Sequence, residues 1–259
     1  MVDDELKNIK ADMEKQGFPL EVNTSRVLEA HGWEVTNQPS YVDLATRKVR
    51  TIDVLAEKNV FLNSKWTFDI WLCVECKKVS KPWVFYASNI DLTKEEIRRK
   101  VVSSTHFSAT KKGNFQRLSN LAIGDFLLGN RYPKSIFNKL AYNSFEPFTE
   151  GKGLSIHKAR MQVSNMVFYL ENSMGNEISS MIKAPCFLLY IPVIIVDGTL
   201  FAFENDELKN VDGLFYHMSH FQSTYVIDVV KATAFEKYLN NMEQTMVDFG
   251  NQLSKQPKF

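Results

Sequence analysis

A long apolar segment that becomes charged at its end runs from Trp66 to Lys78. Its side chains alternate with a period of two, which predicts a buried β-strand. One face of this strand carries Phe68, Ile70, Leu72 and Val74. The other face carries Asp69, Trp71, Cys73, Glu75 and Lys77. Because a buried charge is costly without a partner, Glu75 and Lys77, two residues apart and on the same side, require a structural or chemical reason.

The composition narrows the class of protein. With 31 basic and 30 acidic residues the formal net charge is +1, so a surface that binds nucleic acid must be local. A hydrophobic share of 44% over 259 residues is enough for one large domain or two small ones. The three cysteines do not suggest a disulfide framework.

Nothing in the sequence predicts a membrane partner. The longest apolar run, from about Ala184 to Val196, is too short for a membrane span and is interrupted by Pro185 and Pro192. The first residues are acidic and helical in pattern, so we expect no signal peptide. We therefore expect a cytoplasmic protein in a reducing compartment.

The apolar periodicity predicts alternating helices and strands. Helices are expected over residues 2–16, 19–31 and 155–172 and from about Ala232 onward. Extended segments are expected over 33–38, 49–57, 185–196, 200–203 and 224–230. In the strand 49–57, one face should carry Ile52, Val54 and Ala56, and the other Thr51, Asp53, Leu55 and Glu57. Asp197-Gly198 is typical of a tight turn, with 200–203 as its return strand.

The segment 85–150 differs from its surroundings. A capping box at Thr93-Lys94-Glu95-Glu96 predicts a helix to about Val102, and apolar spacing predicts another over 114–128. Because its apolar content is thin for a separate core, we interpret 85–150 as a largely helical insertion in a single domain that spans 1–259. Residues 205–259 then form a C-terminal strand-helix extension.

Four polar residues attract attention because each lies in or beside an apolar element. Glu21 is in the first turn of a helix, where a carboxylate also simply suits the positive helix end. Asp53 lies within a predicted strand, although Asp has a low propensity for strands. A solvent-facing acid at a strand edge is an equal alternative. Asp53 and Glu75 belong to consecutive strands, which are usually neighbours in space. Two carboxylates there could share Mg²⁺ or Mn²⁺, and Lys77 could orient a water or neutralise an oxyanion.

This arrangement resembles the PD-(D/E)XK nuclease superfamily, which has the restriction-endonuclease-like fold. The matching residues are Asp53, then Glu75-Cys76-Lys77 as the E-X-K element, and Glu21 as the additional acid that many members carry. Ile52 stands where the family often has proline. The resemblance covers about 18–84 and 154–204, in the order helix, three strands, helix, strand. It also implies a polar residue from the helix 155–172, for which Gln162 or Lys158 is the candidate.

The resemblance implies a fold and a function. The fold is α/β, a restriction-endonuclease-like core with a central mixed β-sheet flanked by helices. The implied function is metal-dependent phosphodiester hydrolysis, with Asp53 and Glu75 holding Mg²⁺ or Mn²⁺ and DNA as the expected substrate, in restriction or phage defence. A homodimer follows by analogy, and a helper subunit that supplies DNA affinity is compatible with the near-neutral charge. The alternative is a catalytically silent nucleic-acid-binding or interaction module on the same fold.

A locally basic segment follows the central strand. Its positive residues are Lys94, Arg98, Arg99, Lys100, Lys111, Lys112 and Arg117. Only Glu95 and Glu96 oppose them, so we expect phosphate contacts here if the nuclease interpretation holds, and a solvated helix face otherwise.

Two other motifs are weaker. Cys73 and Cys76 match C-x-x-C, but residues three apart on a strand face opposite sides and cannot hold one ion. His217 and His220 lie among aromatic residues, where packing or surface roles are more frequent than metal binding.

Overall fold

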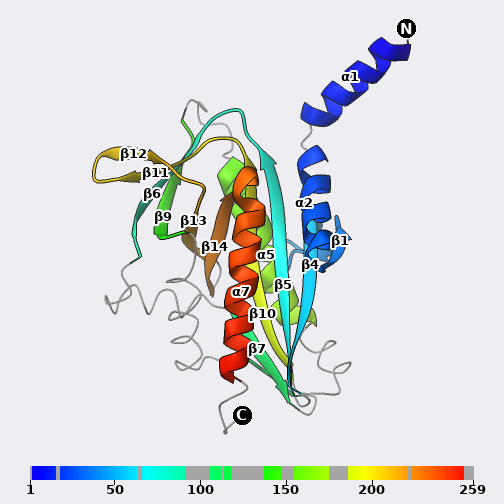
Figure 1. Cartoon of the computed structure of the whole chain (residues 1–259), viewed down its shortest axis with the longest axis vertical. Coiled ribbons are helices and arrows are strands. Elements are labelled where there is room, and N and C mark those ends of the chain that lie inside the picture. The colour runs from blue at the N-terminus through cyan, green and yellow to red at the C-terminus, as the bar shows by residue number, and fades with distance from the viewer. Residues whose placement is uncertain are drawn as a thin grey trace.

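A computed structural model describes residues 2–15, 18–63, 66–90, 106–111, 114–117, 137–147, 155–174, 186–220 and 223–253. It has an α/β architecture in which a large mixed sheet is flanked by helices, which confirms the coarse fold class (Figure 1). The helical elements are α1 (Val2–Lys15), α2 (Phe18–Ala30), α5 (Ser155–Tyr169), η1 (Leu170–Met174), η2 (Ala232–Ala234) and α7 (Phe235–Leu253).

The strands differ in length, and the main sheet contains both parallel and antiparallel neighbours. The first half of the chain contributes β1 (Glu34–Asn37), β2 (Ser40–Val42), β3 (Val49–Thr51), β4 (Val54–Asn63), β5 (Trp66–Lys78), β6 (Trp83–Asn89), β7 (His106–Lys111) and β8 (Asn114–Arg117). The second half contributes β9 (Lys139–Phe145), β10 (Cys186–Asp197), β11 (Leu200–Glu204), β12 (Glu207–Asn210), β13 (Gly213–His220) and β14 (Ser223–Lys231).

The centre of the sheet is the parallel pair β5 and β10. Their register runs from Thr67 opposite Cys186 to Lys78 opposite Asp197. The described strands follow the order β1-β4-β5-β10-β14-β13-β9-β6-β11-β12. The first half of β10 also pairs with β7, and its last residues pair in parallel with β14. The C-terminal segment 205–259 therefore supplies a strand next to the central pair.

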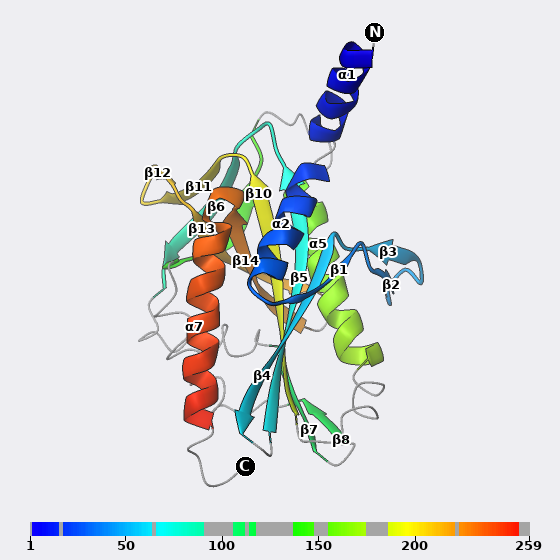
Figure 2. The ribbon, with the colours of Figure 1, turned by 45° about the vertical axis from the view of Figure 1, so that its right-hand side comes forward.

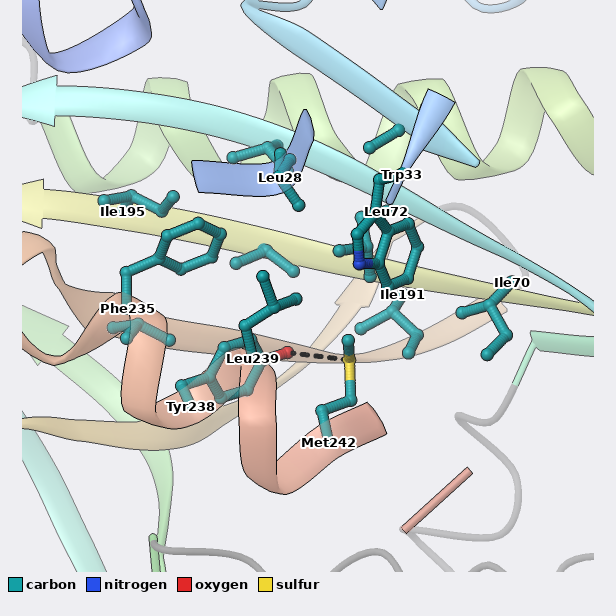
Figure 3. Packing of buried hydrophobic residues seen from close by; sticks show 14 of the residues in the cluster. Leu28, Trp33, Ile70, Leu72, Ile191, Ile195, Phe235, Tyr238, Leu239 and Met242 are labelled. Carbon is teal, nitrogen blue, oxygen red and sulfur yellow. Dashed lines mark hydrogen bonds between the residues drawn. The ribbon is translucent and has the colours of Figure 1, made fainter. Parts of the chain in front are cut away.

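One face of the sheet is covered by α2 and α7. Leu28 and Trp33 from the α2 end, and Phe235 and Leu239 from α7, pack on the central strands in one buried cluster (Figure 3). The strand residues in that cluster include Phe68, Ile70, Leu72 and Val74. The predicted period of two in β5 is thus confirmed for its apolar face.

The opposite face is covered by α5. Ile156, Ala159, Val163 and Met166 of this helix are buried with Cys73 in a second cluster. The start of α5 is fixed by Glu146, which accepts hydrogen bonds from the backbone N–H of Ile156 (2.5 Å) and from Ser155 Oγ (3.0 Å). These bonds satisfy donors that a helix start otherwise leaves open.

The predicted strand 49–57 is two strands with a bend between them. β3 pairs with β2 in a separate two-stranded sheet, whereas β4 joins the main sheet. The bend has Ile52 N–H donating to Pro39 O (3.3 Å), and Gln38 N–H donating to Asp53 O (2.9 Å). As a result Ile52 lies in the α5 cluster while Val54 and Ala56 lie in the α7 cluster, so the predicted common face was wrong for Ile52. Figure 2 shows the β2–β3 hairpin standing out beside α5.

The described part of the segment 85–150 is built of strands. Residues 114–117, predicted as the start of a helix, form β8, which pairs with β7, and Lys139–Phe145 form β9. The expectation of a largely helical insertion is wrong for these residues because pairing with β10, β6 and β13 outweighs local helical spacing. The predicted helix over 93–102 lies outside the described residues.

The tight turn predicted at Asp197-Gly198 does not return the chain against β10. Val79 N–H donates to Asp197 O and Trp83 N–H to Thr199 O, each at 2.9 Å, so the parallel pair β5 and β10 continues as the parallel pair β6 and β11. Gly198 is required here because a Cβ would lie 2.8 Å from Val79 O. Within the described ranges, no helix is both long and apolar enough to cross a membrane.

The packing of α7 predicts a contrast between two of its residues. Leu239 is fully buried, whereas Val247 is 45% exposed. We expect Leu239→Ala to lower the free energy of unfolding by about 2–5 kcal/mol, because it leaves a cavity against the sheet. Val247→Ala should change it by less than about 1 kcal/mol. Urea unfolding measures both, and equal losses would contradict the assignment of α7 to the core.

Candidate active site

The end of β5 brings a carboxylate and an ammonium together inside the sheet. Glu75 pairs with Ile194 of β10 and is completely buried. Lys77 Nζ donates a hydrogen bond to Glu75 Oε1. The other oxygen, Glu75 Oε2, is buried and has no hydrogen-bond partner among the described residues. Such an atom is rare in a folded protein and calls for an explanation.

Asp53 comes to the same place from the bend before β4. Val54 lies opposite Val74, and the same antiparallel register continued by one residue sets Asp53 opposite Glu75. Asp53 Oδ2 accepts a hydrogen bond from Cys76 N–H (2.7 Å). The main chain of β5 therefore holds the carboxylate of Asp53 beside Glu75.

Glu21 approaches from the first turn of α2. Gln38 Nε2 donates to Glu21 Oε2 (3.2 Å), and both residues line a hollow of about 400 Å³ between α2 and β1. Ser25 of the same helix donates to Asn37 Oδ1 (2.5 Å), which ties α2 to the end of β1. The structure thus brings Glu21, Asp53, Glu75 and Lys77 into one neighbourhood.

The charges of these four residues act on one another. Burial and the charge of Asp53 together raise the pKa of Glu75 to about 7, although Lys77 lowers it. Burial also raises the pKa of Asp53, whereas the hydrogen bond from the Cys76 N–H and the charge of Lys77 lower it. The pKa of Glu21 is raised by burial and by Asp53. Three carboxylates and one ammonium thus leave an excess of negative charge.

A raised carboxyl pKa does not by itself distinguish the end of β5 from the rest of the sheet. Burial together with Asp69 and Glu34 raises the pKa of Glu57 to about 7, further along the same sheet. There, however, Asp69 has Asn59 as a hydrogen-bond donor, and no lysine is part of the group. The end of β5 differs because it combines an unpartnered buried oxygen with an adjacent cation.

The residues at this place suit a divalent cation in part. Among the described residues no group of three or more His, Cys, Asp and Glu side chains is arranged to hold a metal ion. Mg²⁺ nevertheless usually takes only one or two protein carboxylates, and waters and phosphates complete its shell. Asp53 and Glu75 supply that number, and Glu75 Oε2 is an acceptor with no other partner.

Gln162 and Lys158 do not join the carboxylates directly. Both line a separate hollow between α5 and the β2–β3 hairpin, together with Tyr41. Tyr41 donates from its hydroxyl to Gln162 O (3.3 Å), and the charge of Glu75 contributes to raising the Tyr41 pKa. Tyr41 therefore stands between the helix and the carboxylates. Tyr41 and Gln38 could not be predicted as part of this site from the sequence, because only the bend at Asp53 brings their turn to this place.

Most of the basic residues between Lys94 and Arg117 lie outside the part of the chain that the structure describes. Lys94, Arg98, Arg99, Lys100 and Lys112 lie outside the described residues. Lys111 is in β7, which pairs with the start of β10, and Arg117 is in β8, which pairs with β7. Arg117 pairs with Ser108 of β7, and Ser108 pairs with Leu188 of β10. Leu188 lies six residues before Ile194, the partner of Glu75, which is a distance of about 20 Å along the strand. The backbone positions of these two residues are therefore remote from the carboxylates.

The weaker motifs are accounted for by packing. Cys73 lies in the α5 cluster and Cys76 in the α7 cluster, which confirms that the two thiols face opposite sides. His217 lies on β13 with its ring 5.7 Å from that of Tyr142. The side chain of His220 is not among those described.

No family model matches the chain, and comparison with curated proteins and with solved structures gave no match either.

The burial of Glu75 predicts a stability that depends on pH. A carboxyl whose pKa is raised on folding destabilises the folded state as pH rises from about 4.5 to about 7, because the folded protein must then bury the charge. Glu75→Gln removes that charge, so we expect it to stabilise the protein by about 2 kcal/mol at pH 8. The gain should vanish near pH 4. The exposed Glu29→Gln on α2 serves as the control in thermal melts at both pH values, and a destabilised Glu75→Gln at pH 8 would contradict the assignment.

Proposed function

We propose that the protein is a metal-dependent nuclease that hydrolyses phosphodiester bonds in DNA. The observation that carries the proposal is the completely buried Glu75. Its Oε2 has no hydrogen-bond partner in the described part of the chain, although Asp53 and Lys77 lie beside it. A structural carboxylate at the centre of a sheet would be expected to satisfy both oxygens. An unsatisfied oxygen among like charges is instead expected where a protein binds a cation.

Asp53 and Glu75 are the residues that would hold the ion, Mg²⁺ or Mn²⁺. When bound, such an ion lowers the pKa of a water and stabilises negative charge on a phosphate. The chain's own contribution is to fix the two carboxylates. The Cys76 N–H holds Asp53 Oδ2, and the β10 partner Ile194 holds the backbone of Glu75 in register.

Lys77 is suited to handle charge at the phosphate. Its ammonium already lies against Glu75 Oε1, so it enters the site from the same face of β5. A lysine in this position can orient a water or neutralise a developing oxyanion, since it is a compact point charge with three donors. Glu21, whose pKa is raised, is suited to accept a proton from a water, while Gln38 fixes its carboxylate.

The order of elements supports the resemblance on which the proposal also draws. Apart from the β2–β3 hairpin and the strands β6 to β9, the chain runs α2, β1, β4, β5, α5 and β10. In the sheet β1, β4, β5 and β10 are neighbours in that order. This is the order helix, three strands, helix, strand. Restriction or phage defence is the biological setting that the resemblance implies, and a homodimer or a helper subunit belongs to the same proposal.

A catalytically silent module that binds nucleic acid is the second candidate. It is favoured by the absence, among the described residues, of a ready group of three metal-binding side chains. The two candidates differ in whether the carboxylates support turnover.

Cleavage of supercoiled plasmid with Mg²⁺ or Mn²⁺ tests the proposal. We expect Asp53→Asn and Lys77→Gln to lower the rate about 100-fold or more, because one removes an oxygen ligand and the other a charge at the phosphate. EDTA should abolish cleavage. Lys78→Gln, the exposed neighbour on β5, should cleave like the wild type.

Two results would count against the proposal. If Asp53→Asn and Lys77→Gln cut as fast as wild type while circular dichroism shows them folded, the site assignment fails. If wild type cuts neither DNA nor RNA with either metal, the silent binding module takes its place.

A further inference from the structure

A second hollow, of about 700 Å³, lies between α5 and the β2–β3 hairpin. Arg50 of the hairpin and Lys158 of the helix line it from opposite sides, with uncharged donors between them. Those donors are Thr46, Thr51, Gln162 and Asn165. We call this hollow the hairpin groove. Lys and Arg mixed with Thr, Asn and Gln make up the set of side chains that contacts phosphate and sugar in protein–DNA complexes.

Two of the three charged side chains that line the hairpin groove are cations. These are Arg50 of the hairpin and Lys158 of α5, and Asp43 is the acid. Arg47 and Lys48, in the turn between β2 and β3, do not line the groove, but both are exposed and have no ion pair with any described residue. Helix α5 contains no acidic residue from Ser155 to Tyr169. In a chain of net charge +1 this is a local concentration of cations.

The one acid that lines the groove is occupied by the hairpin itself. Asp43 Oδ1 accepts hydrogen bonds from Ala45 N–H (3.0 Å) and Thr46 N–H (3.2 Å). Asp43 Oδ2 accepts from Asn165 Nδ2 (3.4 Å) and lies 3.8 Å from Arg50 Nε. Asp43 therefore folds the loop and fixes it to α5. Arg50 remains 51% exposed in spite of this partner.

The hairpin groove adjoins the candidate active site through Tyr41. Tyr41 lines the groove, and its hydroxyl is bonded to Gln162 O. Tyr41 also packs in one buried cluster with Ile52, the neighbour of Asp53, and with Cys73 of β5. A chain of phosphates lying in the groove would therefore continue toward the carboxylates at the end of β5. A single small anion would use only the groove.

We propose that the hairpin groove binds the sugar-phosphate backbone of the DNA strand that leads into the carboxylate site. The choice of DNA rests on the proposed function. The groove itself rests on the charges, the uncharged donors and the contact through Tyr41. It also differs from the predicted basic segment, because Lys111 and Arg117 have their backbones about 20 Å or more from Glu75 along the strand.

Binding without cleavage tests this proposal. A fluorescent 30-base-pair duplex is titrated with protein in EDTA, so that nothing is cut, and fluorescence anisotropy gives the affinity at several salt concentrations. We expect Arg50→Gln with Lys158→Gln to weaken binding about tenfold or more at low salt. The slope of log affinity against log salt should fall by about 2, because two phosphate contacts are lost. Lys209→Gln with Lys237→Gln removes two exposed lysines from β12 and α7 and should leave both quantities unchanged.

A second pair of changes guards against misfolding. Arg50 lies near Asp43, so its loss can disturb the hairpin. The side chains of Lys48 and Lys158 are exposed and form no ion pair with a described residue. Lys48→Gln with Lys158→Gln should therefore weaken binding while the thermal melt stays that of wild type. Lys48→Arg with Lys158→Arg should restore the salt dependence.

The possible outcomes separate this proposal from the proposed function. If the groove variants bind like wild type while Asp53→Asn abolishes plasmid cleavage, the groove is overturned and the nuclease stands. If the groove variants lose affinity but wild type cuts no nucleic acid, the groove stands and the nuclease falls. A wild type with no measurable affinity for the duplex overturns the groove.

Discussion

The burial of Glu75 is the constraint to which the rest of the structure is fitted. A carboxylate inside a sheet loses its hydration, and here Asp53 adds a like charge beside it. Lys77 and the Cys76 N–H offset part of that cost, and Glu75 Oε2 still has no partner among the residues that the structure describes. A fold can carry such a group only if its surroundings fix it, which the long parallel pairing of β5 with β10 does. A group that locally destabilises the folded state is typical of a functional site.

The central strands and the helices could be predicted from the sequence because their signal is local. A period of two over thirteen residues indicates β5 and its faces, and a period near 3.6 indicates α5 and α7. The meeting of Asp53 with Glu75 also follows from consecutive strands that pair antiparallel. The separation of Cys73 from Cys76 follows from the same alternation. These features need no knowledge of distant contacts.

Features set by distant pairing could not be predicted. The bend at Ile52 depends on hydrogen bonds from Gln38 and Ile52 across the turn at Pro39, and apolar spacing alone continues the strand through it. Likewise β8 exists because β7 pairs with it and with β10, although the spacing from Asn114 onward is helical. The parallel pair β5 and β10 continues as the parallel pair β6 and β11 only because Val79 closely approaches Gly198. Tertiary pairing outweighs local propensity in each case.

The bend at Ile52 has consequences on both faces of the sheet. On one side the bend places Asp53 opposite Glu75. The carbonyl of Asp53 accepts the Gln38 N–H, and the Gln38 side chain donates to Glu21. On the other side it directs β3 away from the sheet, so that the β2–β3 hairpin reaches α5 and places Tyr41 near Glu75. The carboxylates and the hairpin groove are therefore positioned by one backbone feature.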